Sequence, residues 1–357
     1  MTETSSSSSF SHLSVARTTT DVTQNTVENV MTSSSSGGAD RYFQGAVLVI
    51  GIVGTATNAL IIYAMIASKQ HKKHVLIFNQ NVLDCVSCVL MIITYSLKLS
   101  NIYVSGTIGY LLCALVLSEG LISSALVGSV INLAAITVER YLKIVHSAWS
   151  QNHLRNWMTY TAMAFSWLTG IIYNVVLVSS SYLSAGMELP SAAVIGGACY
   201  GYTTSESETG SLVPIIGGFI LFYLNVLLIF IFCYWRILIV IRRQAAVMAS
   251  HGTATGSSAG QTQLHQMQSS VIKTMILVCA FYGISWLPNY LCIFLIQLSP
   301  STPLENVYHA SVFLVFLYTA TNPFIYVAKF DPVRNILLGL FSWKQPSEQS
   351  TRNTQNT

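Results

Sequence analysis

Seven long apolar segments, separated by short stretches that hold almost all the charged residues, constrain this chain more than any other feature. Each segment can cross a hydrocarbon core, which needs about 20 helical residues. The segments lie near 44–68, 75–99, 109–143, 157–180, 211–241, 271–298 and 306–328. Charged residues make up only 8% of the chain, against about a quarter in an average soluble domain. The pattern predicts an all-α membrane protein, a bundle of seven transmembrane helices, and excludes a soluble enzyme.

The basic residues are distributed unevenly over the connecting segments. Fourteen of the 17 lysines and arginines fall in the connections on one side of the predicted membrane, and only Arg17, Arg41 and Lys98 fall on the other. Because cytosolic loops are enriched in Lys and Arg, we expect an extracellular amino end and a cytosolic carboxyl end in the plasma membrane. No basic face remains outside the loops that flank the membrane, so a nucleic-acid partner is not expected.

Composition divides the chain into three parts. Residues 1–42 are rich in Ser and Thr and hold no apolar run, so they are predicted to form a disordered extracellular tail. Residues 43–342 are predicted to form the membrane domain, which ends in a short amphipathic eighth helix near 331–342. Residues 343–357 are predicted to be a cytosolic tail. The segment 243–270, rich in Ala, Gly, Ser and Gln, is predicted to be a flexible loop.

Two of the seven cysteines, Cys113 and Cys199, lie near loops on the predicted extracellular side. A disulfide between them is the simplest expectation, because disulfides persist in oxidising compartments. Most of the other cysteines lie in apolar segments, where cysteine packs as a small hydrophobic residue. Cys85 and Cys88 form a C-x-x-C pair, but it lies in a hydrophobic segment, and we expect no metal or redox role there.

Polar residues inside the predicted spans are functional candidates because hydrocarbon makes them costly. Asp84 is the sole acid deep in the second span. Asn58 and Asn322 are the amide side chains expected to meet it, and Ser129 and Thr319 offer further oxygen atoms. An isolated carboxylate in such a place must be neutral, paired or bound to a cation. We interpret the group as a hydrogen-bonded network that can hold a sodium ion; the alternative is a network that only packs the helices.

The tripeptide Glu139-Arg140-Tyr141 lies at the cytosolic end of the third span. Adjacent glutamate and arginine side chains are expected to pair, so that protonating or displacing Glu139 frees Arg140.

Pro288 and Pro323 lie within the sixth and seventh spans, where each removes a backbone donor and is predicted to kink its helix.

A bulky ring accompanies each of these prolines. Trp286 lies two residues before Pro288, and the kink beside it is predicted to act as a hinge that opens the cytosolic side. Tyr326 follows Pro323 and is expected to face the interior near Arg140. One transmembrane proline is usually a neutral kink, but several in register favour a switch.

Together these motifs resemble those of the rhodopsin-like (class A) family of G-protein-coupled receptors. The resemblance rests on Asn58, Asp84, E-R-Y at 139–141, Trp167, W-L-P at 286–288 and N-P-F-I-Y at 322–326. It covers about 43–342 and implies an outward-facing ligand pocket, a sodium site around Asp84 and a cytosolic cleft for a heterotrimeric G protein. Other implied partners are arrestin, a receptor kinase and membrane lipids.

The resemblance also assigns roles to single residues. Arg140, Tyr234 and Tyr326 fit the activation positions of the family, and Cys113 and Cys199 look like its extracellular bridge. No cofactor is implied other than the sodium ion.

Three departures from the family pattern lead to further expectations. Cys113 lies 27 residues before Arg140, two more than is usual, which predicts an irregular top of the third span or a displaced bridge. Val226 stands where the fifth-span proline of the family usually lies. Gln268 stands where the sixth helix carries an acidic partner for the arginine, which predicts some ligand-independent signalling.

Ligand chemistry is constrained by three positions. Ile122 stands where amine receptors of the family carry aspartate, which disfavours a monoamine, and Phe316 stands where opsins attach retinal, which excludes a Schiff base there. Glu119 lies roughly 31 Å of helix above Arg140, near the pocket mouth, and can contact a cationic ligand group. Its alternatives are a place in the headgroup zone or a pair with Lys98.

The remaining predicted pocket residues are Trp286, Asn289, Tyr290 and Tyr308. Acidic residues in the segment 181–210, and Glu305, surround the predicted mouth and favour a basic, neuropeptide-like ligand. The alternatives are a lipid or another small molecule, or a different class of protein, a transporter or channel.

Overall fold

The structure is a computed structural model that describes residues 38–184, 192–200, 212–251, 258–299, 304–327 and 331–341. The chain divides into two units between Gly45 and Ala46. Only the first turns of helix α2 are described in the first unit, and the arrangement below is that of the second. Residues 1–37 and 343–357 of the predicted tails lie outside the described residues.

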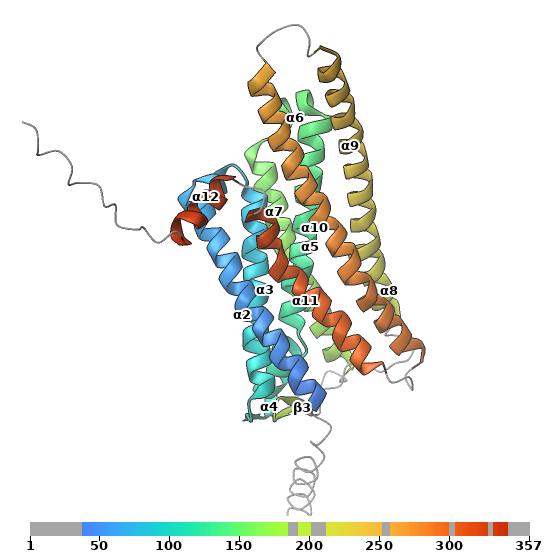
Figure 1. The fold of residues 1–357 in the computed structure, drawn as a ribbon. Coiled ribbons are helices and arrows are strands. Elements are labelled where there is room, and N and C mark those ends of the chain that lie inside the picture. The colour runs from blue at the N-terminus through green and yellow to red at the C-terminus, as the bar shows by residue number, and fades with distance from the viewer. Residues whose placement is uncertain are drawn as a thin grey trace, which may run out of the picture. The chain divides into compact units, whose positions relative to one another are not determined.

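Helices coincide with all seven predicted spans (Figure 1). They are α2 (Gly38–Ala67), α3 (Val75–Leu99), α4 with α5 (Gly106–Leu111, Gly120–Val145), α7 (Asn156–Ser184), α8 with α9 (Leu212–Gly218, Asn225–His251), α10 (Ser258–Leu298) and α11 (Glu305–Val327). Among the described residues, five stretches are long and apolar enough to cross a membrane. These are Asp40–Ala67, Val75–Leu99, Gly106–Val145, Ile215–Gln244 and Ile276–Leu298. The predicted all-α membrane class is confirmed.

Shorter elements complete the described chain. They are the 3₁₀ turn η2 (Gln70–Lys72), α6 (Ser147–His153) and α12 (Asp331–Phe341). The last of these falls on the segment for which an amphipathic helix is expected. A small antiparallel sheet in the order β1-β2-β3 joins Tyr103–Val104, Ala193–Ile195 and Ala198–Tyr200. Val194 pairs with Val104 on one side and Cys199 on the other.

The prediction of a flexible loop at 243–270 is wrong for most of that segment. Helix α9 continues to His251 and α10 begins at Ser258, which leaves 252–257 outside the described residues. A polar composition does not by itself exclude a helix. Its Ala, Gln and Met residues are good helix formers, and no proline interrupts them.

Two spans contain π-helical turns. The segment η3, Leu112–Leu117, follows α4, and Glu119 then takes a left-handed conformation with φ 63° before α5 begins. The third span is therefore irregular at its outer end, where the surplus of two residues predicts irregularity. The segment η4, Phe219–Leu224, joins α8 to α9, and it lies just before Val226, the residue that replaces the usual proline.

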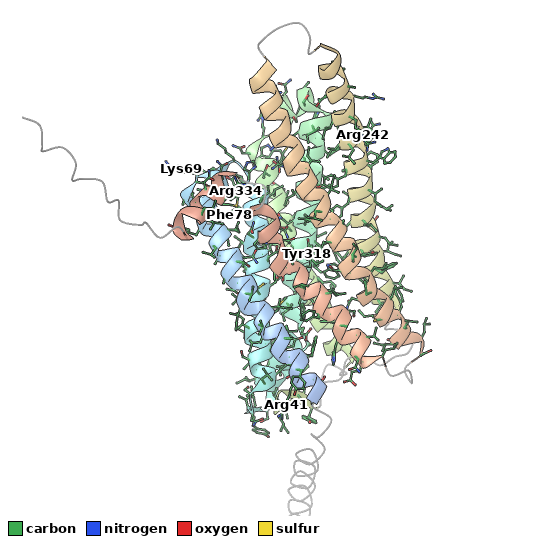
Figure 2. All side chains as sticks on the ribbon, in the orientation of Figure 1. Arg41, Lys69, Phe78, Arg242, Tyr318 and Arg334 are labelled. Atoms are coloured by element: carbon green, nitrogen blue, oxygen red, sulfur yellow. A yellow bond between two sulfur atoms is a disulfide. The ribbon has the colours of Figure 1, made fainter. Side chains whose placement is uncertain are left out.

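Several polar side chains are buried among the apolar core residues, and large apolar side chains also cover the outer surface of the bundle. Asn58, Asp84 and Asn322 are fully buried, whereas Leu228 and Trp235 on α9 are more than half exposed. Such an exposed apolar surface suits lipid rather than water. Lys69, Arg242 and Arg334 lie toward the same end of the bundle (Figure 2), the predicted cytosolic end.

Candidate functional site

Asp84 lies at the centre of a buried network that joins three helices. Asn322 Nδ2 on α11 donates to Asp84 Oδ2 at 2.8 Å, and Ser129 Oγ on α5 donates to Oδ1 at 2.7 Å. Gln80, one turn earlier on α3, donates to both carboxylate oxygens at 3.3 Å and also contacts Ser129. All four side chains are fully buried, so α3, α5 and α11 are linked through one carboxylate.

The network extends to Trp167 on α7 through Asn132 and Asn79, which sequence reasoning missed. Asn132 Nδ2 donates to Gln80 Oε1 at 2.8 Å, Asn79 Nδ2 donates to Asn132 Oδ1 at 2.9 Å, and Trp167 Nε1 donates to Asn79 Oδ1 at 2.9 Å. A signal was present in the sequence: Gln80 precedes Asp84 by four residues and Asn132 follows Ser129 by three, spacings that put each pair on one helix face.

Asn58 and Thr319 lie beside this network without bonding directly to Asp84. Asn58 Nδ2 donates to the carbonyls of Gly54, at 2.9 Å, and Thr319, at 3.3 Å. The Thr319 hydroxyl donates to the carbonyl of Phe316 at 2.8 Å. Thr319 thus takes part through its backbone oxygen, and the expected contact of Asn58 with Asp84 is replaced by one with α11.

Unsatisfied oxygen atoms remain around Asp84. The Oδ1 atoms of Asn58 and Asn322 are buried without a hydrogen-bond partner among the described residues. The two ion pairs of the described chain do not include Asp84. Since hard cations prefer oxygen ligands, this group of a carboxylate, a hydroxyl and two amide oxygens fits a small hard cation such as sodium.

Arg140, at the inner end of α5, contacts the beginning of α3. Its Nη2 lies 3.1 Å from His74 Nδ1, and its Nε has no hydrogen-bond partner among the described residues. The prediction that Glu139 pairs with Arg140 is wrong, because Glu139 forms an ion pair with Lys143 instead. Residues four apart on a helix face each other, whereas adjacent residues do not.

His74 accepts from Arg140 only as a neutral imidazole. Burial, together with the positive charges of Arg140, Lys143 and Lys73, lowers the His74 pKa to about 4, and Glu139 acts in the opposite direction. Arginine offers only donors, so the contact requires the neutral tautomer in which Nδ1 is the acceptor and Nε2 carries the proton. Sequence reasoning missed His74, which ends the loop before α3 and lies 66 positions from Arg140.

The other predicted activation residues surround the same inner end. Tyr234 OH lies 3.3 Å from Thr137 Oγ1, one turn before Tyr141. The Tyr141 hydroxyl lies 3.2 Å from His146 Nε2, and its ring packs against Phe232. The side chains of Tyr326 and Gln268 lie outside the described residues.

Aromatic rings on α10 pack against η4. Trp286 has its ring centroid 5.9 Å from that of Tyr282 and 6.1 Å from that of Tyr290. Tyr282 donates to the carbonyl of Phe222, and Tyr290 donates to that of Gly218 at 3.4 Å. The π-helical turn and the end of α8 thus each offer a carbonyl group to α10, shortly before Val226, where the usual proline is absent.

Both predicted prolines lie inside their helices, Pro288 in α10 and Pro323 in α11. The Nε1 atom of Trp286, beside Pro288, is buried without a hydrogen-bond partner among the described residues. The indole is therefore held by ring packing alone, and a change in the kink can move it without breaking a hydrogen bond.

Glu119 pairs with Lys98, one of the alternatives left open by the sequence. Lys98 Nζ lies 2.5 Å from Glu119 Oε1, and Tyr95 OH donates to the same oxygen at 2.7 Å. The Tyr95 ring meets the edge of Phe316 with centroids 6.1 Å apart. Both charged side chains keep about a fifth of their surface exposed, 20% for Lys98 and 24% for Glu119.

The remaining predicted pocket residues lie on three helices, and Ser311 links two of them, since its hydroxyl donates to the carbonyl of Tyr308 at 2.7 Å. Ile122 is only 1% exposed and packs in the core. Asn289 Nδ2 donates to Ser311 Oγ on α11 at 3.4 Å. The Tyr308 ring is tilted by 45° against that of its neighbour His309, with centroids 6.2 Å apart.

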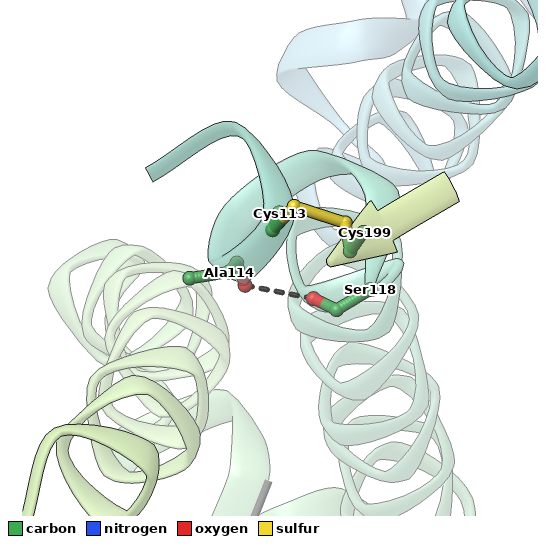
Figure 3. The surroundings of a disulfide bond; sticks show 4 residues. All are labelled: Cys113, Ala114, Ser118 and Cys199. Atoms are coloured by element: carbon green, nitrogen blue, oxygen red, sulfur yellow. Dashed lines mark hydrogen bonds between the residues drawn. A yellow bond between two sulfur atoms is a disulfide. The ribbon is translucent and has the colours of Figure 1, made fainter. Parts of the chain in front are cut away.

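A disulfide joins Cys113 in η3 to Cys199 in β3 (Figure 3), as predicted. Beside it, the Ser118 hydroxyl donates to the carbonyl of Ala114 at 2.7 Å. The bridge therefore forms on the π-helical turn, which accommodates the two additional residues between Cys113 and Arg140. It fixes the small sheet against the third span.

Comparisons with known proteins support this architecture. The profile of the family described as 7 transmembrane receptor (rhodopsin family) matches residues 57–326. Melanopsin-B of Gadus morhua is 26% identical over 298 residues, which cover 82% of this chain and 46% of that protein. Trace amine-associated receptor 7d of Mus musculus is 27% identical over 62% of this chain and 61% of that protein. C5a anaphylatoxin chemotactic receptor 1 of Homo sapiens is 25% identical over 78% of this chain and 73% of that protein. The chain thus spans less than two thirds of the first two relatives.

Proposed function

Because the chain belongs to the rhodopsin family of seven-transmembrane receptors, we propose that it transduces binding of an extracellular ligand into activation of a heterotrimeric G protein. The proposed location is the plasma membrane, with the amino end outside and the carboxyl end in the cytosol, as the distribution of Lys and Arg predicts. Arrestin and a receptor kinase are proposed as further cytosolic partners.

The buried link through Asp84 between α3, α5 and α11 carries this proposal. A shift of α11 or α5 must break the hydrogen bond of Asn322 or Ser129 to the carboxylate. Such a network favours two discrete arrangements over a continuous range. A ligand that binds one arrangement more tightly shifts the population toward it. The contact of Arg140 with His74 lies at the inner end of the same bundle.

A sodium ion at Asp84 is part of the proposal. The unsatisfied Oδ1 atoms of Asn58 and Asn322 support it, as does the lack of an ion-pair partner for Asp84 in the described chain. When bound, the ion supplies positive charge to a carboxylate in an apolar bundle. Ser129 and Asn322 hold the carboxylate from two helices.

For the ligand we propose a basic peptide, with a lipid or another small molecule as the alternative. Lys98 already pairs with Glu119, so a small amine has to displace a lysine before it reaches the carboxylate. A peptide with several basic groups can also form ion pairs with the acidic residues of the segment 181–210. Most of this segment lies outside the described residues. One of the relatives is named as a receptor for the C5a anaphylatoxin.

The test is expression of the full chain with a panel of Gα biosensors, screened against peptide, amine and lipid libraries. We expect a peptide agonist whose response is lost in Arg140→Ala and whose potency falls in Glu119→Gln. Lys98→Met, which leaves Glu119 unpaired, should raise the potency of a ligand that uses Glu119. Substrate uptake or ionic current without G-protein activation would favour a transporter or channel instead.

A further inference from the structure

A polar cavity of about 370 Å³ opens at the predicted cytosolic end of the bundle. Three lysines line it: Lys72 and Lys73 come just before α3, and Lys143 lies in the last turn of α5. The opposite wall belongs to α7, which contributes Asn156 and Thr159. The cavity is separate from the Asp84 network and from the aromatic cluster of α10.

Glu139 also lines the cavity, so its side chains carry three positive charges and one negative charge. Lys143 pairs with Glu139, but neither ion pair of the described chain includes Lys72 or Lys73. Helix α7 begins at Asn156, a lining residue, so the positive end of its dipole lies at the wall. An anion with more than one negative charge complements this set of groups.

The cavity lies at the level where the chain enters the membrane. Val75, the first residue of the α3 span, lines it. Tyr160 lines the α7 side and is 52% exposed, and Trp157, one turn earlier, is 61% exposed. Tyrosine and tryptophan concentrate at membrane–water interfaces, so these rings place the cavity at the depth of lipid headgroups.

We propose that this cavity binds the phosphorylated headgroup of an anionic lipid of the cytosolic leaflet, specifically a phosphoinositide with more than one phosphate. The proposal rests on the membrane orientation given above. Basic pockets at the cytosolic ends of transmembrane helices are suited to such headgroups. Phosphatidylserine fits less well, because its own ammonium group meets the three lysines and it carries one phosphate rather than several.

The first experiment measures saturable binding of a fluorescent phosphatidylinositol bisphosphate to the purified full chain in phosphatidylcholine nanodiscs. Neutralising both unpaired lysines in Lys72→Gln/Lys73→Gln should weaken binding by roughly tenfold or more, since each basic group near the surface contributes about 1 kcal/mol. The matched control is Arg242→Gln/Arg243→Gln, which removes two positive charges from α9, outside the cavity. An equal loss in both variants shows attraction by the cytosolic surface as a whole and overturns the proposal.

A second variant tests the cavity without changing its charge. Thr159→Phe places a ring inside the cavity and leaves every lysine in place, so it should lose affinity as the double lysine variant does. Unchanged affinity in Thr159→Phe overturns the placement in the cavity. Thermal unfolding of each variant without the phosphoinositide checks that the fold is intact.

Two further arms identify the anion. Phosphatidylserine at matched total charge should not displace the probe, and equal displacement overturns the selectivity. Soluble inositol trisphosphate should compete only at a higher concentration than the lipid; binding as tight as that of the lipid assigns the site to free inositol phosphates and overturns the proposal. These assays need neither agonist nor G protein, so their failure is distinguishable from failure of the proposed receptor function.

Discussion

Arg140 Nη2 lies 3.1 Å from Nδ1 of His74, so the arginine of the E-R-Y tripeptide is held by the beginning of α3 rather than by the adjacent acid. Glu139 instead forms an ion pair with Lys143 on the same helix. A motion that carries Arg140 toward a cytosolic partner must first break its contact with the imidazole. His74 therefore stabilises the arrangement seen here.

His74→Ala should raise ligand-independent signalling. Loss of a hydrogen bond to the charged guanidinium removes about 1 kcal/mol or more of stabilisation from the arrangement seen here, which shifts the population about fivefold or more toward one in which Arg140 is released. The measurement is basal G-protein dissociation, normalised to surface expression. His71→Ala is the matched control, because His71 contacts the carbonyl of Met65 and not Arg140. Equal basal signals in His74→Ala and the wild type would contradict this role.

Acidification should weaken the same contact. The His74 pKa is about 4 in the folded chain, against an ordinary value of 6.5, so the unfolded chain binds more protons at this residue between these two values. Stability from neutral His74 is complete above pH 6.5 and falls as pH decreases, by at most about 3 kcal/mol below pH 4. Thermal unfolding from pH 7.5 to pH 5 measures it. His74→Gln should show a smaller decrease, and identical slopes in the two proteins would rule out His74 as the cause.

Asp84→Asn should abolish stabilisation of the receptor by sodium. Any ion that binds the folded chain alone raises its apparent stability by mass action, so the melting temperature of the wild type should be higher in sodium chloride than in choline chloride of equal ionic strength. Ser87→Ala is the control on the same helix, because within the part of the chain that the structure describes the Ser87 hydroxyl bonds only to the carbonyl of Leu83. Retained sodium dependence in Asp84→Asn would remove the ion from this site.

The sequence predicts the fold well because hydrophobicity and charge alone determine it. The seven spans follow from apolar length, and the predicted bridge of Cys113 with Cys199 is confirmed. The prediction of a flexible loop at 243–270 was wrong for most of that segment, because a polar composition does not distinguish a loop from a polar helix.

The candidate site was less predictable, for two separate reasons. The pairing of Glu139 was wrong although the geometry of a helix already favours Lys143, four residues on. The contact of His74 with Arg140 was beyond reach, since it depends on the register in which α3 packs against α5. Gln80 lies between these cases: its spacing from Asp84 was visible, but its bond to Ser129 again needed the packing of two helices.

Gly170→Ala should destabilise the contact of α5 with α7. A Cβ at Gly170 would lie 2.4 Å from the carbonyl oxygen of Ser124, and the Ser124 hydroxyl donates to the Gly170 carbonyl at 2.9 Å. The two backbones therefore meet at a point with no room for a methyl group, and forcing them apart should cost about 1–3 kcal/mol. Gly217→Ala in α8 is the matched control, since a Cβ there has nothing within 4 Å and alanine favours helix. The melting temperature should fall in Gly170→Ala and not in Gly217→Ala; a similar change in both would mean that loss of glycine, not the crossing of α5 and α7, governs the result.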